Sequence, residues 1–168
     1  STKFYAEKMI QYIDSNLDDD KPFFSYLAFT APHWPLQAPD ESVEKYRGKY
    51  DAGYEALFAS RLQALKDRGI RGESDSGPPL SEGQTPWDEL NEEQKRVEVR
   101  TMEIYAAMID DLDVYVGKVI NFLEEKGELD NTFIFFMSDN GAEGHDFTNY
   151  SFGEWSRSCC DNSYENMG

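Results

Sequence analysis

The sequence predicts an α/β fold in which buried parallel strands are joined by a long helical crossover. Two apolar runs of strand length, residues 22–29 and 131–137, suit strands that are buried on both faces of a sheet. A helical pattern from about residue 87 to residue 126 lies between them. Two such strands with a helical connection imply a parallel pair with a right-handed crossover.

The composition is that of a folded domain and argues against several classes of partner. The chain has 168 residues, with 16 Lys and Arg against 33 Asp and Glu, so its formal net charge is −17. This excess of acid argues against binding to nucleic acid or to an anionic membrane surface. No run of about 18 apolar residues is present, so no transmembrane helix is expected. With 14% aromatic and 39% apolar residues, the chain can build a core.

The first part of the chain combines a helix, a strand and a proline-rich turn. Residues 3–17 place five apolar side chains on one helical stripe: Phe4, Met9, Ile10, Ile13 and Leu17. The strand expected at 22–29 leads directly into residues 30–36. Pro32 and Pro35 prevent a further strand or helix there.

Two helices and a loop are expected next. Residues 41–47 and 54–68 have helical patterns, and Gly69 closes the second. Residues 71–86 are rich in Gly, Ser, Pro and acids, so we expect a surface loop. The acids in this region lack the spacing of a metal-binding loop, which favours a solvated segment.

The long helix is expected to begin at Thr85-Pro86, a cap residue followed by proline, and to end at Gly127. Its apolar residues recur at spacings of three and four: Met102, Tyr105, Ile109, Leu112, Val116, Val119 and Leu123. This stripe favours a helix docked on a sheet, with a short coiled coil as the alternative. We expect three further residues of this helix, Asp110, Asp111 and Asp113, to form an exposed acidic face rather than a metal site.

The residues with the most reactive side chains follow the two expected strands. His33 comes after the first strand, and Asp139-Asn140-Gly141 comes after the second. Ligands of open parallel sheets gather at the carboxyl ends of the strands, so we expect His33 and Asp139 to face one cleft. Asp139 and Asn140 offer hard oxygen ligands that suit Ca²⁺ or Mg²⁺, and His33 can contact an anion or protonate a leaving oxygen. The combination fits metal-assisted cleavage of an oxyanion ester.

Simpler interpretations stay open for each of these residues. A His between prolines and an Asp-Asn-Gly sequence are both typical of turns. Two oxygen ligands are also fewer than the six to eight that Ca²⁺ takes, so most of such a site would come from elsewhere. His145 with Asp146 is a second, weaker candidate ligand pair. The adjacent Cys159 and Cys160 match no zinc spacing and are expected to be free thiols in a loop.

Several segments resemble the type I sulfatases. Residues 29–39 (FTAPHWPLQAP) resemble the segment that contributes a sulfate-contacting histidine in that family, and residues 136–144 (FMSDNGAEG) resemble its metal-binding Asp-Asn segment. Residues 43–53, 102–108 and 161–168 look like the bacterial-type arylsulfatase branch. The resemblance covers nearly the whole chain, and its motifs are specific in their combination and order.

The resemblance implies a hydrolase of small-molecule sulfate esters with an alkaline-phosphatase-like α/β fold. The family's nucleophile is a formylglycine hydrate, made from Cys or Ser in a Cys/Ser-x-Pro/Ala-x-Arg motif, and a Ca²⁺ ion and basic residues stabilise the sulfate oxygens. By match of motif, His33 contacts the sulfate and helps to protonate the leaving oxygen. Asp139 and Asn140 are two of the metal ligands.

The chain departs from the family pattern at several points. Neither Cys159 nor Cys160 begins the modification motif, and nothing before His33 matches the family's first pair of metal-binding Asp residues. The lysine expected after the Asp-Asn segment is missing, since no Lys follows Lys126, and the chain opens without Met. We therefore expect residues 1–168 to be the central portion of a sulfatase catalytic domain, incomplete at both ends and inactive by itself.

Two other functions remain as alternatives. A phosphodiesterase or phosphonate hydrolase of the same superfamily would use the same strand ends with Mn²⁺ or Zn²⁺. More His and Asp ligands would favour it, and this chain has only two His. The second alternative is a truncated, non-catalytic α/β module that binds a partner or an ion.

Overall fold

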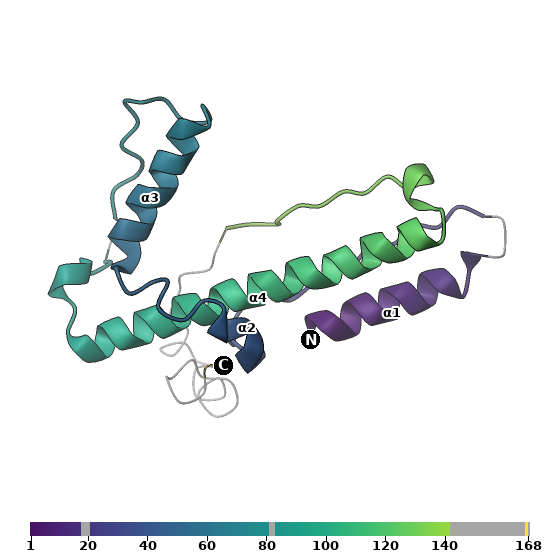
Figure 1. Cartoon of the computed structure of the whole chain (residues 1–168), viewed down its shortest axis with the longest axis horizontal. Helices are drawn as coiled ribbons and strands as arrows, with labels where there is room; N and C mark the ends of the chain where they lie inside the picture. The colour runs from purple at the N-terminus through teal and green to yellow at the C-terminus, as the bar shows by residue number, and fades with distance from the viewer. Residues whose placement is uncertain (18–20, 81–82, 142–166, 168) are drawn as a thin grey trace.

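The computed structural model describes residues 1–17, 21–80, 83–141 and 167, and one long helix runs through its centre (Figure 1). This helix, α4 (Glu92–Glu125), is 34 residues long. The helix α1 (Thr2–Asp14) runs beside its C-terminal half in the same direction, and α2 (Asp40–Glu44) packs against its middle. The helix α3 (Gly53–Asp67) stands near its N-terminal end. Within the described ranges, no helix is long and apolar enough to cross a membrane.

The start of α4 differs from the one predicted, and its end agrees. Trp87–Glu89 form a short 3-10 helix, η2, and the extended backbone of Leu90 separates it from α4. Asn91 is the true cap: its side chain accepts a hydrogen bond from the backbone N–H of Gln94, and the Gln94 side chain accepts one from the N–H of Asn91, at 2.9 Å each. This reciprocal pair satisfies two of the backbone N–H groups that the first turn of α4 leaves without partners inside the helix. At the other end Gly127, with φ of +73°, terminates the helix as expected.

The two expected strands are not seen among the described residues. Residues 21–30 carry no regular secondary structure, Leu129–Asn131 form a 3-10 helix, η3, and residues 132–138 run as an unpaired segment. A strand requires a neighbour whose backbone groups pair with its own, and no described segment supplies one here. Most aromatic side chains of the two runs are consequently exposed; Phe24 is 93% exposed and Phe133 87%.

The hydrophobic core lies between α2, the segment around Leu36, and α4. Its buried members are Leu36, Val43, Ile104, Ala107, Met108 and Met167. The buried face of α4 is therefore not the predicted stripe, of which only Leu123 is buried. The reason is that α2 and the Leu36 segment pack on the adjacent face, whereas the sheet expected against the stripe is not formed by the described residues.

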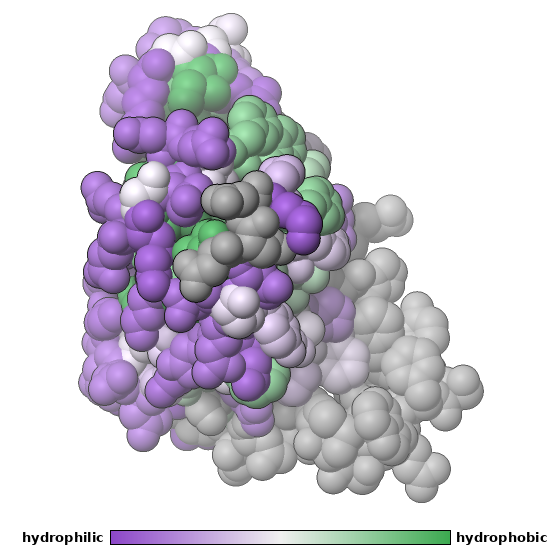
Figure 2. Space-filling model, turned by 90° about the vertical axis from the view of Figure 1, so that its right-hand side faces the viewer, coloured by the Kyte–Doolittle hydropathy of each residue, from purple (hydrophilic) through white to green (hydrophobic). Residues whose placement is uncertain are grey.

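The remaining helices agree with the apolar spacing in part. The helix α1 covers most of the predicted 3–17, and it buries Ala6 and Ile13. Lys126 forms an ion pair with Asp14 at 2.6 Å, which joins the C-terminal ends of α4 and α1. The predicted helix at 54–68 is α3, whereas α2 ends at Glu44 and is followed by turns. Figure 2 shows a mainly hydrophilic surface on one face of the molecule, as the charge of −17 leads one to expect.

Candidate functional site

His33 lies at the tip of a tight turn and is exposed. Its backbone N–H donates a hydrogen bond to the carbonyl of Thr30 at 3.0 Å, which closes the turn. Its ring nitrogen Nδ1 lies 2.7 Å from the carbonyl oxygen of Trp34, and the His33 and Trp34 rings are 5.7 Å apart between centroids. The side chain is therefore held at Nδ1 and presents its other edge to solvent.

The core fixes both ends of this turn. Leu36 is buried in the core cluster, and Ala31 packs against the same cluster from the other end of the turn. Trp34, which follows His33, is partly buried. His33 is thus an exposed polar group on a segment that is anchored on either side, which is the arrangement a ligand-contacting side chain needs.

Asp139 and Asn140 lie in a second exposed bend, after residues 132–138. The Oδ1 atom of Asp139 accepts a hydrogen bond from the N–H of Asn140 at 3.0 Å. The side-chain N–H of Asn140 donates to the carbonyl oxygen of Gly141 at 2.7 Å, so the Oδ1 atom of Asn140 takes no part in this bond. Ser138 Oγ donates to the carbonyl of Asn140 at 2.5 Å and tightens the bend. Among the described residues, no hydrogen bond uses the second carboxylate oxygen of Asp139 or the Oδ1 atom of Asn140, so each residue has one hard oxygen that could bind a cation.

The described residues contain no complete metal site. No group of three or more His, Cys, Asp or Glu in them lies close enough to hold a metal ion. Within the same ranges, no hydrogen bond or ion pair joins His33 to Asp139 or Asn140. Both bends carry the expected donor types, and their meeting in one cleft remains a prediction.

Asp110 and Asp111 do not form the exposed acidic face that the sequence predicts. Lys45 Nζ donates to Asp110 at 2.5 Å, and the Tyr46 hydroxyl donates to its other oxygen at 3.2 Å. Ser42 donates to Asp111 at 2.6 Å. The hydrogen bond from Lys45 holds the pKa of Asp110 below its ordinary value. These acids are structural partners of α2, and only Asp113 is exposed as expected.

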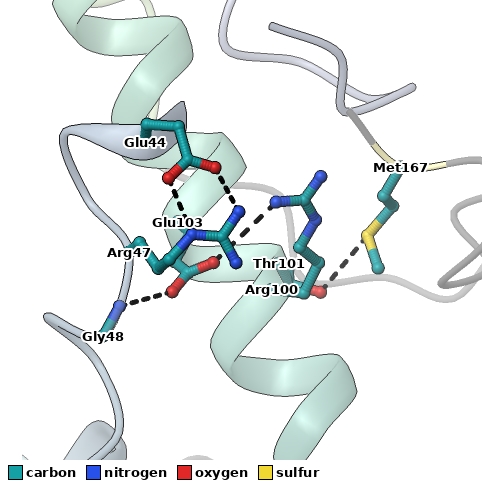
Figure 3. A network of polar contacts seen from close by, with 7 residues as sticks. All are labelled: Glu44, Arg47, Gly48, Arg100, Thr101, Glu103 and Met167. Atoms are coloured by element: carbon teal, nitrogen blue, oxygen red, sulfur yellow. Dashed lines mark hydrogen bonds and ion pairs between the residues drawn. The ribbon is translucent and has the colours of Figure 1, made fainter. Parts of the chain in front are cut away.

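A buried carboxylate that the sequence did not reveal connects α4 to the turn after α2 (Figure 3). Glu103 is 5% exposed, and its Oε1 atom accepts a hydrogen bond from the backbone N–H of Gly48 at 2.7 Å. Arg100 lies 3.9 Å from its other oxygen. Figure 3 also shows Arg47 paired with Glu44 and Met167 in contact with Thr101 beside this carboxylate. The cluster forms a polar rim of the core.

An open cavity lies elsewhere, between the start of α3, residues 83–85 and the first turns of α4. Its volume is about 430 Å³, and its lining includes Tyr54, Thr85, Leu90, Glu93 and Glu98. Burial raises the pKa of Glu98. Neither His33 nor Asp139 lines this cavity.

Some residues that the sequence singles out lie outside the described residues. They are His145, Asp146, Cys159 and Cys160, together with most of the 161–168 segment. Their expected roles stay predictions.

The sequence of this chain is similar to those of several known proteins. A family model described as Sulfatase matches residues 1–159. The chain is 51% identical over 145 residues to an uncharacterized sulfatase of Schizosaccharomyces pombe, covering 86% of this chain and 26% of that protein. It is 37% identical over 169 aligned positions to the arylsulfatase of Klebsiella aerogenes, covering 100% of this chain and 36% of that enzyme.

A third relative is more distant. The chain is 27% identical over 155 residues to the multifunctional alkaline phosphatase superfamily protein PehA of Trinickia caryophylli, covering 83% of this chain and 27% of that protein. The chain thus spans between about a quarter and about a third of the length of these three relatives. The family model extends over all but the last nine residues and includes both candidate bends, so the chain belongs to the sulfatase family.

Proposed function

We propose that residues 1–168 are the central portion of a sulfatase catalytic domain and that the complete enzyme hydrolyses sulfate esters of small molecules. The observation that carries the proposal is the family match over residues 1–159, a range that includes the His33 turn and the Asp139-Asn140 bend. The relative from Klebsiella aerogenes, which aligns with the whole chain, is named an arylsulfatase. The family has an alkaline-phosphatase-like α/β fold, and the parallel pairing of 22–29 and 131–137 in it is part of this proposal.

His33 is the proposed catalytic residue of this chain. Its exposed ring is held through Nδ1 by the carbonyl of Trp34, so the opposite nitrogen is available to an anionic group. An imidazolium can donate a hydrogen bond to a sulfate oxygen and can protonate the oxygen that leaves. In this role His33 assists departure of the alcohol or phenol.

Asp139 and Asn140 are the proposed metal ligands, and Ca²⁺ is the proposed ion. Carboxylate and amide oxygens are the donors that Ca²⁺ prefers, and the hydrogen bonds of this bend leave one such oxygen free on each residue. They would fill two of the six to eight positions that this ion takes, so the other ligands belong to the rest of the complete enzyme. When bound, a divalent cation offsets the negative charge of the sulfate oxygens.

The proposed nucleophile, a formylglycine, lies outside this chain. No Cys/Ser-x-Pro/Ala-x-Arg sequence occurs in the 168 residues. We therefore expect the purified 168-residue chain to show no turnover of an aryl sulfate. Turnover above background by this chain would contradict the assignment of the nucleophile to another part of the enzyme.

A phosphodiesterase or phosphonate hydrolase is the second candidate. The similarity to a protein named as a multifunctional member of the alkaline phosphatase superfamily favours it, because one fold can support more than one chemistry. The two candidate substrates carry the same single negative charge and differ in size, because a phosphodiester has a second organic group on phosphorus where a sulfate ester has only oxygen. A non-catalytic binding module is the third, and the neighbouring coding sequence distinguishes it.

The test is an assay of the complete enzyme, obtained from the coding sequence around this segment. We expect an upstream Cys-x-Pro-Ser-Arg sequence, and hydrolysis of 4-nitrophenyl sulfate well above that of bis(4-nitrophenyl) phosphate. The reverse preference would favour the phosphodiesterase. A start codon and a stop codon directly at the ends of this segment would favour the binding module.

A further inference from the structure

The ring of His33 has one nitrogen committed to the protein and one left for a ligand. We propose that the backbone carbonyl of Trp34 is a positioning group that fixes the tautomer of His33, so that Nε2 alone acts on the sulfate ester. The inference rests on the proposed function for its chemistry. The tautomer itself is a property of the chain and can be measured without any activity.

The hydrogen bond determines where the proton lies. Nδ1 of His33 is 2.7 Å from the carbonyl oxygen of Trp34, and a carbonyl oxygen can only accept. Nδ1 must therefore carry a hydrogen in both the neutral and the charged ring. No described residue bonds to Nε2, which is consequently the acceptor nitrogen of the neutral ring.

The backbone around this bond holds the carbonyl in place. The turn is closed by the His33 N–H to Thr30 bond at 3.0 Å, and Leu36 and Ala31 attach it to the core on either side. Trp34 is followed by Pro35, whose nitrogen has no hydrogen, so this peptide unit offers the ring an acceptor and no competing donor. Free histidine in water prefers the opposite tautomer, with the hydrogen on Nε2. The bond to Trp34 thus imposes a preference that the isolated side chain lacks.

The imposed tautomer has a chemical consequence. A neutral His33 turns a lone pair toward a sulfate oxygen and repels it, whereas the imidazolium donates Nε2–H. During cleavage the nucleophile's oxygen forms a bond to sulfur, and the bond from sulfur to the ester oxygen breaks with its electron pair. That oxygen takes the proton from Nε2. The ring is then left neutral with its hydrogen on Nδ1, which is the tautomer that the Trp34 carbonyl already binds, so no tautomer exchange is needed.

Two-bond ¹H–¹⁵N correlation spectra of the ¹⁵N-labelled chain test the proposal. Spectra are taken at about pH 8.5, well above the ordinary histidine pKa of about 6.5. The variant His145→Gln leaves His33 as the single histidine and assigns its signals. We expect a protonated, pyrrole-type Nδ1 and a pyridine-type Nε2. A hydrogen mainly on Nε2, as in a free histidine peptide recorded alongside, would overturn the proposal.

A second variant separates the carbonyl of Trp34 from its indole ring. Trp34→Phe keeps the backbone carbonyl and an aromatic ring but removes the indole N–H. We expect the Nδ1–H tautomer to persist in this variant. Loss of this tautomer in a Trp34→Phe variant with unchanged helical circular dichroism would overturn the proposal that the Trp34 carbonyl fixes it. The spectrum of the unsubstituted chain shows independently which tautomer His33 adopts.

Discussion

The buried carboxylate of Glu103 accepts a hydrogen bond from the backbone N–H of Gly48, which lies 55 positions earlier in the chain, at 2.7 Å. This bond links α4 to the turn that follows α2. Gly48 has a φ of +74°, in the left-handed region where glycine carries no steric penalty. The two residues join α4 to the segment after α2 at the polar edge of the core.

Removing the Glu103 acceptor should destabilise the chain. Glu103→Ala leaves the Gly48 N–H without its partner, so we expect a loss of about 1–3 kcal/mol in the free energy of unfolding. Glu103→Gln keeps an oxygen acceptor and should lose less. Urea unfolding followed by circular dichroism measures both. The matched control is Glu93→Ala, an exposed acid of the same helix paired with Arg96, for which about 0–1 kcal/mol is expected; equal losses at the two positions would contradict a special role for Glu103.

Gly53 is expected to tolerate no side chain. Its φ is +84°, and a Cβ atom there would lie 2.3 Å from the indole of Trp87. Gly69→Ala is the comparison, because Gly69 has a similar φ of +68° with nothing within 4 Å of the added atom. Gly69→Ala should therefore cost only the backbone strain, about 1–2 kcal/mol. Gly53→Ala should lower the free energy of unfolding by more than this. A thermal unfolding midpoint of Gly53→Ala that is no lower than that of Gly69→Ala would contradict the close contact between Gly53 and Trp87.

The Asp110 ion pair should make stability depend on pH in a defined direction. The hydrogen bond from Lys45 lowers the pKa of Asp110, so the charged form is favoured by folding. The resulting stabilisation is present above the unfolded pKa of about 3.9 and is lost as the pH falls through the folded pKa. Asp110→Asn should therefore be less stable than the unsubstituted chain at pH 7, and the difference should shrink toward zero in acid. A difference that is the same at both pH values would mean that charge is not the cause.

Glu98 should behave in the opposite way. Burial raises its pKa, so folding favours the protonated form. This contribution is present below the unfolded pKa of about 4.3 and is lost as the pH rises through the folded pKa. Glu98→Gln should consequently raise the stability at pH 7 and leave it unchanged in acid. Unfolding curves of Glu98→Gln and of the exposed control Glu93→Gln at both pH values distinguish burial from a general effect of reducing the net charge of −17.

The helices were predictable because they depend on local spacing. The apolar pattern predicted α3 to within a residue at each end, and Gly127 marked the end of α4 correctly. The start of α4 was wrong because two cap signals compete, and the reciprocal bonds of Asn91 and Gln94 satisfy more backbone groups than Thr85-Pro86 can. Local patterns cannot rank such alternatives without the geometry of the turn.

Features that depend on distant contacts were beyond the sequence pattern. A prediction from apolar periodicity treats every acid as exposed. Apart from the glycine at position 48, nothing in the sequence therefore predicted that Glu103 is buried and bonded to Gly48. The expected strands at 22–29 and 131–137 need neighbours to pair with, which a count of apolar residues does not supply. The position of His33 on an exposed turn follows from Pro32 and Pro35, whereas its role, like those of Asp139 and Asn140, depends on residues of the complete enzyme.

The metal ligands can be tested in the complete enzyme. Asp139→Ala removes one of the two oxygens that this chain offers, so we expect a clear loss of Ca²⁺ affinity in isothermal titration calorimetry. Ser138→Ala, which alters the same bend without removing a proposed ligand, is the control and should retain the metal. Calcium binding by Asp139→Ala that equals that of the unsubstituted enzyme would remove Asp139 from the site.

The most direct test of the proposed sulfatase activity is the hydrolysis of 4-nitrophenyl sulfate by the complete enzyme with and without the His33 ring. We expect His33→Gln to lower kcat/KM by about 10²–10⁴-fold, the range that general acid catalysis contributes, while Ca²⁺ binding stays unchanged. Unchanged kinetics in His33→Gln would contradict the assignment of His33 to the site, and an unsubstituted enzyme that does not hydrolyse the ester would contradict the proposed sulfatase activity.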